Sequence, residues 1–147
     1  MEEALRAVPN ETGGVLMGYW AAPYTEVVIT DAIGPGRNAV HYEKSFIPDS
    51  EYQESEIARV YRESDRVSTY LGDWHTHPFG SSYLSYRDKR TLRRIAKHQD
   101  ARCPIPVMAI ASGHDDDWLL RIWRYEEPAG LLGLIRIRVA SLEPIPY

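Results

Sequence analysis

The segment 68–77, STYLGDWHTH, constrains the fold of this chain more than any other. Its aromatic and apolar residues fall near alternate positions, a pattern that predicts a β-strand. Amphipathic helical patterns lie on both sides of it, over 49–65 and 86–99. The first of them opens with a capping-box signature, Ser50 with Gln53. Strand and helix patterns are therefore mixed along the chain, which favours an architecture of both α and β elements.

Further elements flank this centre. We expect, in chain order, a helix over 2–8 that stops at Pro9, a hairpin of strands over 13–21 and 25–34, a second hairpin over 105–112 and 117–126, and a half-buried strand over 131–140. Because hairpins are frequent and strict β-α-β units are few, an α+β fold with a mixed sheet fits better than a doubly wound fold. No repeat or linker-like stretch divides the chain, and we expect a single domain over 1–147.

Composition limits the classes of function. The 147 residues are 44% apolar, enough for one compact core, and the net charge of −4 argues against a nucleic-acid binder. No run of about 18 apolar residues is present, so no membrane partner is expected. A single cysteine, Cys103, excludes an internal disulfide framework and a thiolate zinc cluster. Together with an acidic N-terminus that lacks a signal-peptide core, these features predict a cytoplasmic protein. The basic run over 87–102 is expected to be a solvated helix face.

Two histidines, His75 and His77, end the predicted strand. Residues two apart on a strand point to the same face, with Cα atoms about 6.6 Å apart, so two imidazoles can converge on one ion. Pro78 has no N–H to donate and is expected to end the ladder, which frees the following residues to fold over the site. Ser85 is the predicted N-cap of the next helix, and Asp88 falls in the first helical turn. That position holds a carboxylate near the end of the strand.

Two histidines and one aspartate are protein ligands that zinc accepts, with a fourth position open for water, as in catalytic zinc sites. Hydrolysis also needs a group that takes the proton of the water and passes it to the leaving amine. Glu11, in NETGGVLMG, is the candidate, because the two glycines after it permit close backbone approach. Spacing alone leaves open whether Glu11 meets the histidines. The remaining histidines, His41, His98 and His114, lack partners at ligand spacing and are expected at the surface.

These residues, in this order, resemble the JAMM signature of the JAB/MPN+ metalloproteases. The signature is a glutamate, then H-x-H-P, then S-x-x-D, and here E-T-G-G-V-L-M-G, G-D-W-H-T-H-P and S-Y-R-D follow one another across most of the chain. The resemblance implies a curved, mixed β-sheet flanked by helices. It also implies that one zinc ion is held by His75, His77 and Asp88, that Glu11 is the general acid/base, and that Ser85 stabilises the tetrahedral intermediate.

The sequences ETGGVLMGYW and YLGDWHTHP are most similar to bacterial JAB proteins. Such proteins are commonly encoded beside ubiquitin-activating-like and conjugating-like enzymes, including in antiphage operons. The resemblance therefore implies an isopeptidase or peptidase that removes a ubiquitin-like modifier from its target or trims the C-terminus of the modifier. The implied partners are that modifier or its conjugates and the activating-like and conjugating-like enzymes of the same operon.

The same residues bear on three other functions. An inactive MPN-type interaction scaffold would usually lack one or more ligands, and none is missing here. A peptidase that frees a sulfur-carrier-like protein fits the same site residues. A metal-dependent nuclease is disfavoured by the acidic net charge and the lack of further carboxylate ligands. For a peptidase, the substrate tail is expected to bind as an extended strand, in a groove lined by 36–50 and 78–84. The apolar tail 131–147 would either pair with another chain or pack on the domain.

Overall fold

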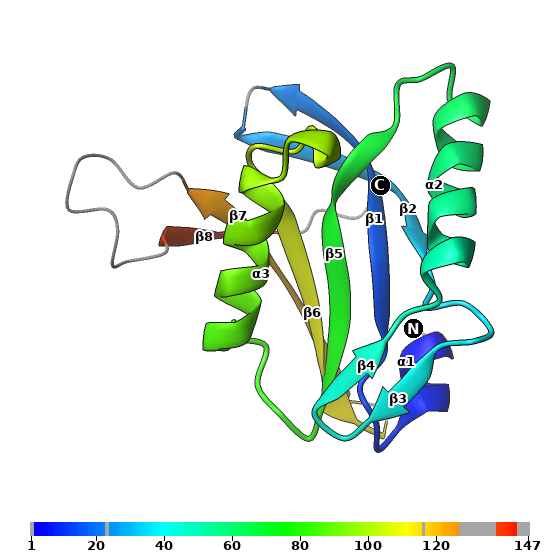
Figure 1. Cartoon of the computed structure of the whole chain (residues 1–147). Coiled ribbons are helices and arrows are strands. Elements are labelled where there is room, and N and C mark those ends of the chain that lie inside the picture. The colour runs from blue at the N-terminus through cyan, green and yellow to red at the C-terminus, as the bar shows by residue number, and fades with distance from the viewer. Residues whose placement is uncertain (1, 23, 116, 127–137, 144–147) are drawn as a thin grey trace.

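The computed structural model describes residues 2–22, 24–115, 117–126 and 138–143. Its elements in chain order are α1 (Glu2–Ala7), β1 (Gly13–Ala22), β2 (Glu26–Ile33), β3 (Val40–Tyr42), β4 (Ser45–Ile47), α2 (Ser50–Glu63), β5 (Thr69–Pro78), α3 (Tyr86–Lys97), a 3-10 turn (Gln99–Ala101), β6 (Val107–His114), β7 (Asp117–Glu126) and β8 (Arg138–Leu142). The strands β2-β1-β5-β6-β7-β8 form one sheet in that order, and β3 pairs with β4 in a separate hairpin (Figure 1).

The large sheet is mixed. β5 and β6 run parallel, and every other pair of neighbours in it is antiparallel. The parallel pair needs a crossover, which α3 supplies between β5 and β6. α2 and α3 stand on either side of β5 in Figure 1, so the sheet is flanked by helices. The α+β fold with a mixed sheet is therefore confirmed. No helix among the described residues is long and apolar enough to cross a membrane.

Both long helices cover the same face of the sheet. Residues Val15 of β1, Asp73 of β5 and Met108 of β6 are direct neighbours across the ladders, so their side chains share that face. The buried cluster under α3 consists of Leu84, Leu92, Met108, Ile110 and Tyr125. The buried cluster under α2 consists of Val15, Met17, Ile33 and Val60. The opposite face carries Leu16, Leu71, Val107, Ala109 and Ile122, against which Trp74 packs. Between the two helices, residues of β5 line a cleft.

The start of α2 differs from the expected capping box. The N-cap is Asp49 rather than Ser50, and the Asp49 carboxylate accepts the Tyr52 N–H at 3.2 Å. Aspartate and serine are about equally good N-cap residues. Asp49, one residue before Ser50, is fixed in place because its carboxylate accepts the side-chain amide of Asn38 at 2.9 Å. The Gln53 side chain is then free of the cap and donates to the Gly34 carbonyl at 3.1 Å.

Other expected elements match the structure within one or two residues, with one addition and one gap. The hairpin of β3 and β4 was not expected as strands, because three-residue strands are too short to show a period of two. Of the strand expected over 131–140, residues 131–137 lie outside the described residues, and 138–140 open β8, which pairs with β7. The assignment of 1–147 to a single domain stays a prediction.

Gly14 illustrates how closely β1 is packed against its neighbours. A Cβ atom there would stand 1.9 Å from the Ile33 carbonyl oxygen and 2.8 Å from the Trp74 indole nitrogen. That nitrogen donates to the same carbonyl at 2.9 Å, so the added atom would displace a hydrogen bond as well. We expect Gly14→Ala to lower the free energy of unfolding by about 1–3 kcal/mol in urea denaturation, through overpacking.

Gly34→Ala is the matched control for Gly14→Ala. A Cβ atom on Gly34 meets nothing within 4 Å, so its free energy of unfolding should stay within about 0.5 kcal/mol of the parent. Equal stability of the two variants would contradict the close approach of β1 to β2.

Candidate metal centre

β5 presents its last residues to the open space between α2 and α3. Asp73, His75 and His77 are two residues apart, so their side chains share the helix-covered face. Pro78 is the last residue of the strand, as expected, and Phe79 donates its backbone N–H to the Gly113 carbonyl at 3.0 Å as the chain leaves the sheet. The two histidines thus lie at the end of a central strand, where the parallel neighbour β6 holds the backbone.

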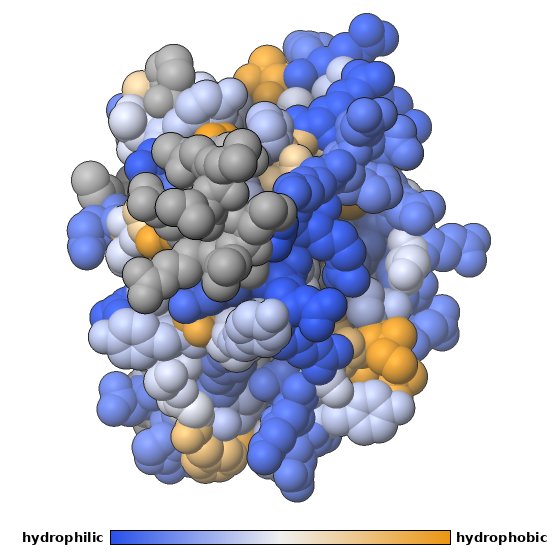
Figure 2. Space-filling model, turned by 60° about the vertical axis from the view of Figure 1, so that its left-hand side comes forward, coloured by the Kyte–Doolittle hydropathy of each residue, from blue (hydrophilic) through white to orange (hydrophobic). Residues whose placement is uncertain are grey.

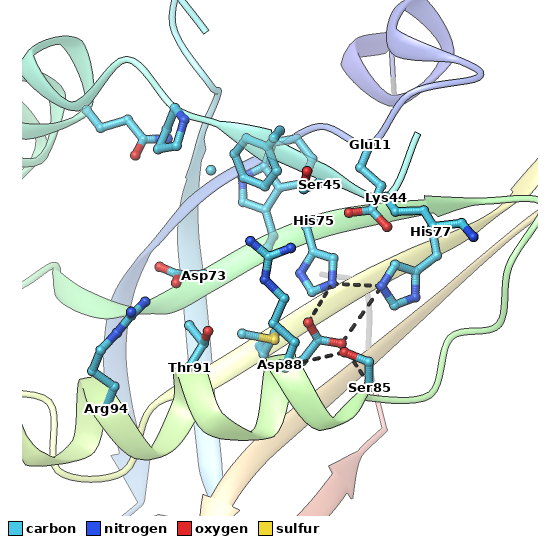
Figure 3. A pocket seen from close by; sticks show the side chains of 17 residues that line it. Glu11, Lys44, Ser45, Asp73, His75, His77, Ser85, Asp88, Thr91 and Arg94 are labelled. Atoms are coloured by element: carbon cyan, nitrogen blue, oxygen red, sulfur yellow. Dashed lines mark hydrogen bonds and ion pairs between the residues drawn. The ribbon is translucent and has the colours of Figure 1, made fainter. Parts of the chain in front are cut away.

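α3 brings the third side chain. Ser85 is its N-cap and Asp88 its third residue, joined in a capping box: the Ser85 hydroxyl accepts the Asp88 N–H at 3.2 Å, and the Asp88 carboxylate accepts the Ser85 N–H at 2.7 Å. Both predicted cap positions are confirmed. Of the two Asp88 carboxylate oxygens, only Oδ2 takes part in the capping box. The box therefore fixes the Asp88 side chain while it faces the histidines (Figure 3).

The three side chains converge. The Nε2 atoms of His75 and His77 are 3.0 Å apart, His75 Nε2 is 3.5 Å from Asp88 Oδ1, and His77 Nε2 is 3.8 Å from Asp88 Oδ2. Ligands about 2.0–2.1 Å from a tetrahedral zinc ion lie about 3.3 Å from one another, which is between the His75–His77 separation of 3.0 Å and the separation of 3.5 Å from His75 to Asp88 Oδ1. The donor set of two imidazole nitrogens and one carboxylate is one that zinc accepts.

The orientation of His77 supports the same conclusion. Its Nδ1 lies 2.8 Å from the Ser81 carbonyl oxygen. A carbonyl only accepts, so Nδ1 carries the hydrogen and the Nε2 lone pair points toward His75. Two ring nitrogens and a carboxylate that face one another across about 3 Å favour a cation between them, and the outer hydrogen bond of His77 is the kind that fixes a metal-binding tautomer.

Glu11 reaches this group through the register of β1 and β5. Gly13 pairs with His75, and the ladder is antiparallel, so the chain two residues before Gly13 lies opposite His77. Two further bonds extend the pairing beyond β1: Thr12 donates its N–H to the Thr76 hydroxyl at 2.9 Å, and Thr76 donates its N–H to the Thr12 carbonyl at 2.8 Å. Both threonines are fully buried. Figure 3 shows the Glu11 side chain directed toward the two histidines.

The β3–β4 hairpin holds Glu11 from the other side. The Glu11 N–H donates to the Tyr42 carbonyl at 2.8 Å, and the half-buried His41 ring bonds to the Glu11 carbonyl at 3.0 Å. Sequence reasoning missed this role of His41, expected at the surface, because nothing in its spacing points to a backbone 30 residues away. A Cβ atom on Gly13 would stand 2.5 Å from the Phe46 ring, so the glycine does permit the expected close approach.

The site shifts the acidity of both carboxyl groups. Burial raises the pKa of Glu11, and the neighbouring His77 and His75 only partly oppose it. Burial acts in the same direction on Asp88, but its hydrogen bond and charge interaction with His75, with the bonds to Ser85, hold the pKa of Asp88 well below its usual value. Asp88 is therefore a permanent carboxylate, whereas Glu11 sits nearer to the range in which a proton is both taken and returned.

A cleft of about 460 Å³ contains the whole group. It runs along β5 and α3, and its other wall is formed by Lys44, Ser45, Phe46 and Pro48 of the hairpin and by Gln53 of α2. Lys44, Ser45, Phe46 and Pro48 bear out part of the expected lining by 36–50. The expected lining by 78–84 is wrong for the described cleft. After His77 the chain leaves the cleft, and the next residue that lines it is Ser85. All five predicted site residues, Glu11, His75, His77, Ser85 and Asp88, line it.

Residues 1–126 match the family model described as prokaryotic homologs of the JAB domain. The chain is 46% identical over 124 residues to the probable metalloprotease y4qB of Sinorhizobium fredii, across 84% of this chain and 75% of that relative. It is 29% identical over 113 residues to a CD-NTase/cGAS isopeptidase of Enterobacter hormaechei, across 77% of this chain but only 61% of the length of that relative.

Among solved structures, protein DSY2949 of Desulfitobacterium hafniense superimposes with a TM-score of 0.65 over 98% of this chain and 83% of that one, at 19% identity, and so shares the fold. The family model covers far more than half of the sequence, and the fold agrees with it. The chain belongs to the prokaryotic JAB family.

Proposed function

We propose that this chain is a zinc-dependent peptidase that cleaves a ubiquitin-like modifier from its target or trims the C-terminus of the modifier. The observation that carries the proposal is the meeting of three ligand side chains from β5 and α3 with a carboxyl group held opposite His77 from the neighbouring strand. The names of the relatives support it, since one is a probable metalloprotease and others are isopeptidases.

In this proposal His75, His77 and Asp88 hold one zinc ion. Zinc in such a site lowers the pKa of water to about 7 and polarises a scissile carbonyl. Glu11 takes the proton of the attacking water and returns it to the departing amine, a task for which its raised pKa suits it. The Ser85 hydroxyl oxygen already accepts the Asp88 N–H, so its own hydrogen is free to donate to the developing oxyanion.

The substrate tail binds as an extended strand beside β4. Residues of β4 and its turn, Lys44, Ser45 and Phe46, line the cleft, and among the described strands β4 pairs only with β3. β4 is the strand of the hairpin nearer to β5 in Figure 1, and its edge away from β3 can add a strand without disturbing the large sheet. A tail held there passes over Glu11, because the Glu11 backbone is bonded to the same hairpin.

The relatives named CD-NTase/cGAS isopeptidase support cleavage of an isopeptide bond. Conjugates of a ubiquitin-like protein as the substrate class, and an antiphage operon with activating-like and conjugating-like enzymes as the setting, are part of the proposal and follow from the resemblance of the sequence to bacterial JAB proteins. The test uses the zinc-loaded chain with a panel of ubiquitin-like proteins, each prepared as an isopeptide conjugate to lysine, as a linear fusion and as a sulfur-carrier precursor. Intact-mass spectrometry should show release at the modifier C-terminus from at least one conjugate. Binding of conjugates without release would leave the interaction scaffold in its place, and release from sulfur-carrier precursors alone would identify a processing peptidase.

A further inference from the structure

The lining of the cleft is less acidic than the chain as a whole. The chain carries a net charge of −4, yet the cleft is lined by Lys44, Arg87 and Arg94. Apart from Glu11 and Asp88, which belong to the proposed reaction, its described lining holds one carboxylate, Asp73. The lining therefore balances three cations against three carboxylates in a chain whose net charge is −4, and two of those carboxylates face the proposed reaction centre rather than the arginines.

The three cations are not engaged in ion pairs among the described residues. None of Lys44, Arg87 and Arg94 makes an ion pair or a hydrogen bond within the described part of the chain, and all three are exposed. Asp73, the nearby carboxylate, instead accepts the Tyr70 hydroxyl at 2.7 Å. Unpaired arginines that line a cleft have all five guanidinium N–H donors available for a bound carboxylate.

The arginines are spaced along the cleft rather than clustered. Arg87, Asp88, Thr91 and Arg94 occupy one face of α3 and all line the cleft, so the helix lies lengthwise along it. Arg87 stands at the end near Glu11, where its charge weakly opposes the rise of the Glu11 pKa that burial causes. Arg94 stands at the end near Asp73 (Figure 3). Seven helical residues separate the arginines by about 10.5 Å, which an extended peptide covers in about three residues.

The other basic residues of α3 do not face this space. Lys89, Arg90, Arg93 and Lys97 belong to the same helix but do not line the cleft, and Arg90 lies over the Tyr86 ring, 6.0 Å away. Arg90 and Lys97 are exposed, so the solvated basic face expected from the sequence exists on α3. Hydrophilic residues cover much of the molecular face shown in Figure 2. Only two of the basic residues on α3 turn from that face into the cleft.

We infer that the cleft selects a substrate tail with acidic side chains, spaced about three residues apart so that Arg87 and Arg94 each bind a carboxylate. The inference rests on the proposed function, from which it takes that a substrate tail lies in the cleft as an extended strand. It names the substrate class more narrowly than that function does: a basic tail is rejected, because Arg87, Arg94 and Lys44 would stand against it. An extended peptide is favoured over a nucleic acid, because the cleft ends at groups suited to amide-bond cleavage.

The test measures binding rather than cleavage, in the zinc-loaded Glu11→Gln background, so that its failure is separable from a failure of the proposed peptidase activity. The probes are fluorescent, C-terminally amidated decapeptides of Gly and Ser with two Glu residues three apart, their Gln and Lys twins, and a Glu pair placed side by side. At low salt the Glu peptide with the three-residue spacing should bind about tenfold more tightly than its Gln twin. The Lys twin should bind more weakly than either.

Arg87→Gln and Arg94→Gln should each reduce the preference for Glu over Gln about threefold, and the double variant should remove it. Arg90→Gln is the matched control, because it makes the same charge change on the same helix outside the cleft.

The inference would be overturned if the Gln peptide bound as well as the Glu peptide, or if neither peptide bound measurably. An Arg90→Gln effect as large as that of Arg94→Gln would do the same, as would tighter binding of a dT10 oligonucleotide through the same arginines. A neutral peptide with a free C-terminal carboxylate that matches the Glu peptide would assign the site to a terminal carboxylate instead.

Discussion

The Glu11→Gln variant should bind zinc with unchanged stoichiometry and lose about a thousandfold or more in kcat/KM for a cleavable conjugate. Glutamine keeps the size of the side chain and the backbone bonds to Tyr42 and His41, but its amide can neither take nor return a proton. The loss should appear in kcat with little change in KM, because the substrate contacts proposed for the hairpin and α3 remain. Steady-state kinetics with zinc quantified by mass spectrometry on the same samples separates the two effects.

Glu54→Gln serves as the control for Glu11→Gln. Glu54 is exposed on α2 and does not line the cleft, so its variant should cleave at the parental rate. If Glu11→Gln kept activity within tenfold of the parent, proton transfer would have to be assigned to another group. Loss of zinc along with activity would mean that Glu11 acts through the metal rather than on the proton.

The His77→Ala variant should lose stoichiometric zinc as well as all measurable cleavage. Two of the three donor atoms remain, and we expect affinity for zinc to fall about a hundredfold or more. Zinc binds the folded parent and so raises its melting temperature, whereas it should leave that of His77→Ala nearly unchanged. His77 is a cleaner choice than Asp88, because loss of the Asp88 carboxylate would also remove the capping box of α3.

His98→Ala is the control for His77→Ala. His98 lies at the exposed C-terminal end of α3, far along the helix from Asp88, so its variant should keep both zinc and the zinc-dependent rise in melting temperature. Stoichiometric zinc in His77→Ala would contradict the ligand assignment.

Metal removal by a chelator should abolish cleavage by the parent, and added zinc should restore it.

Local patterns were enough to predict four of the five residues of the candidate site. Alternation on a strand puts His75 and His77 on one face, and the spacing of Ser85 and Asp88 is that of a capping box, so each pair follows from a few consecutive residues. The nearness of Glu11 depends on the register of β1 against β5, which joins residues more than sixty positions apart. Such a pairing is a property of the sheet, and only the resemblance to a known signature supplied it in advance.

The errors in the fold have similar local causes. Asp49 and Ser50 are both strong N-cap residues, so their order in the chain leaves the cap ambiguous until Asn38 is known to hold Asp49. The hairpin of β3 and β4 has three residues in each strand and thus no readable period, and with it the contact of His41 to Glu11 stayed hidden. The basic residues of α3 look alike in sequence, and only the position of the cleft distinguishes Arg87 and Arg94 from the rest.

The capping box at Ser85 and Asp88 has a consequence for anyone who would redesign this centre. Histidine is as good a zinc ligand as aspartate, yet a neutral imidazole at position 88 has one lone pair and could not bind zinc and accept the Ser85 N–H together, whereas the carboxylate has two oxygens and accepts that N–H at 2.7 Å. A change of ligand chemistry would therefore remove one of the two bonds of the capping box and destabilise the first turn of the helix that delivers the ligand. The same carboxylate that would set the charge of the metal site also sets where α3 begins, so amide exchange at the start of α3 should slow when zinc is added.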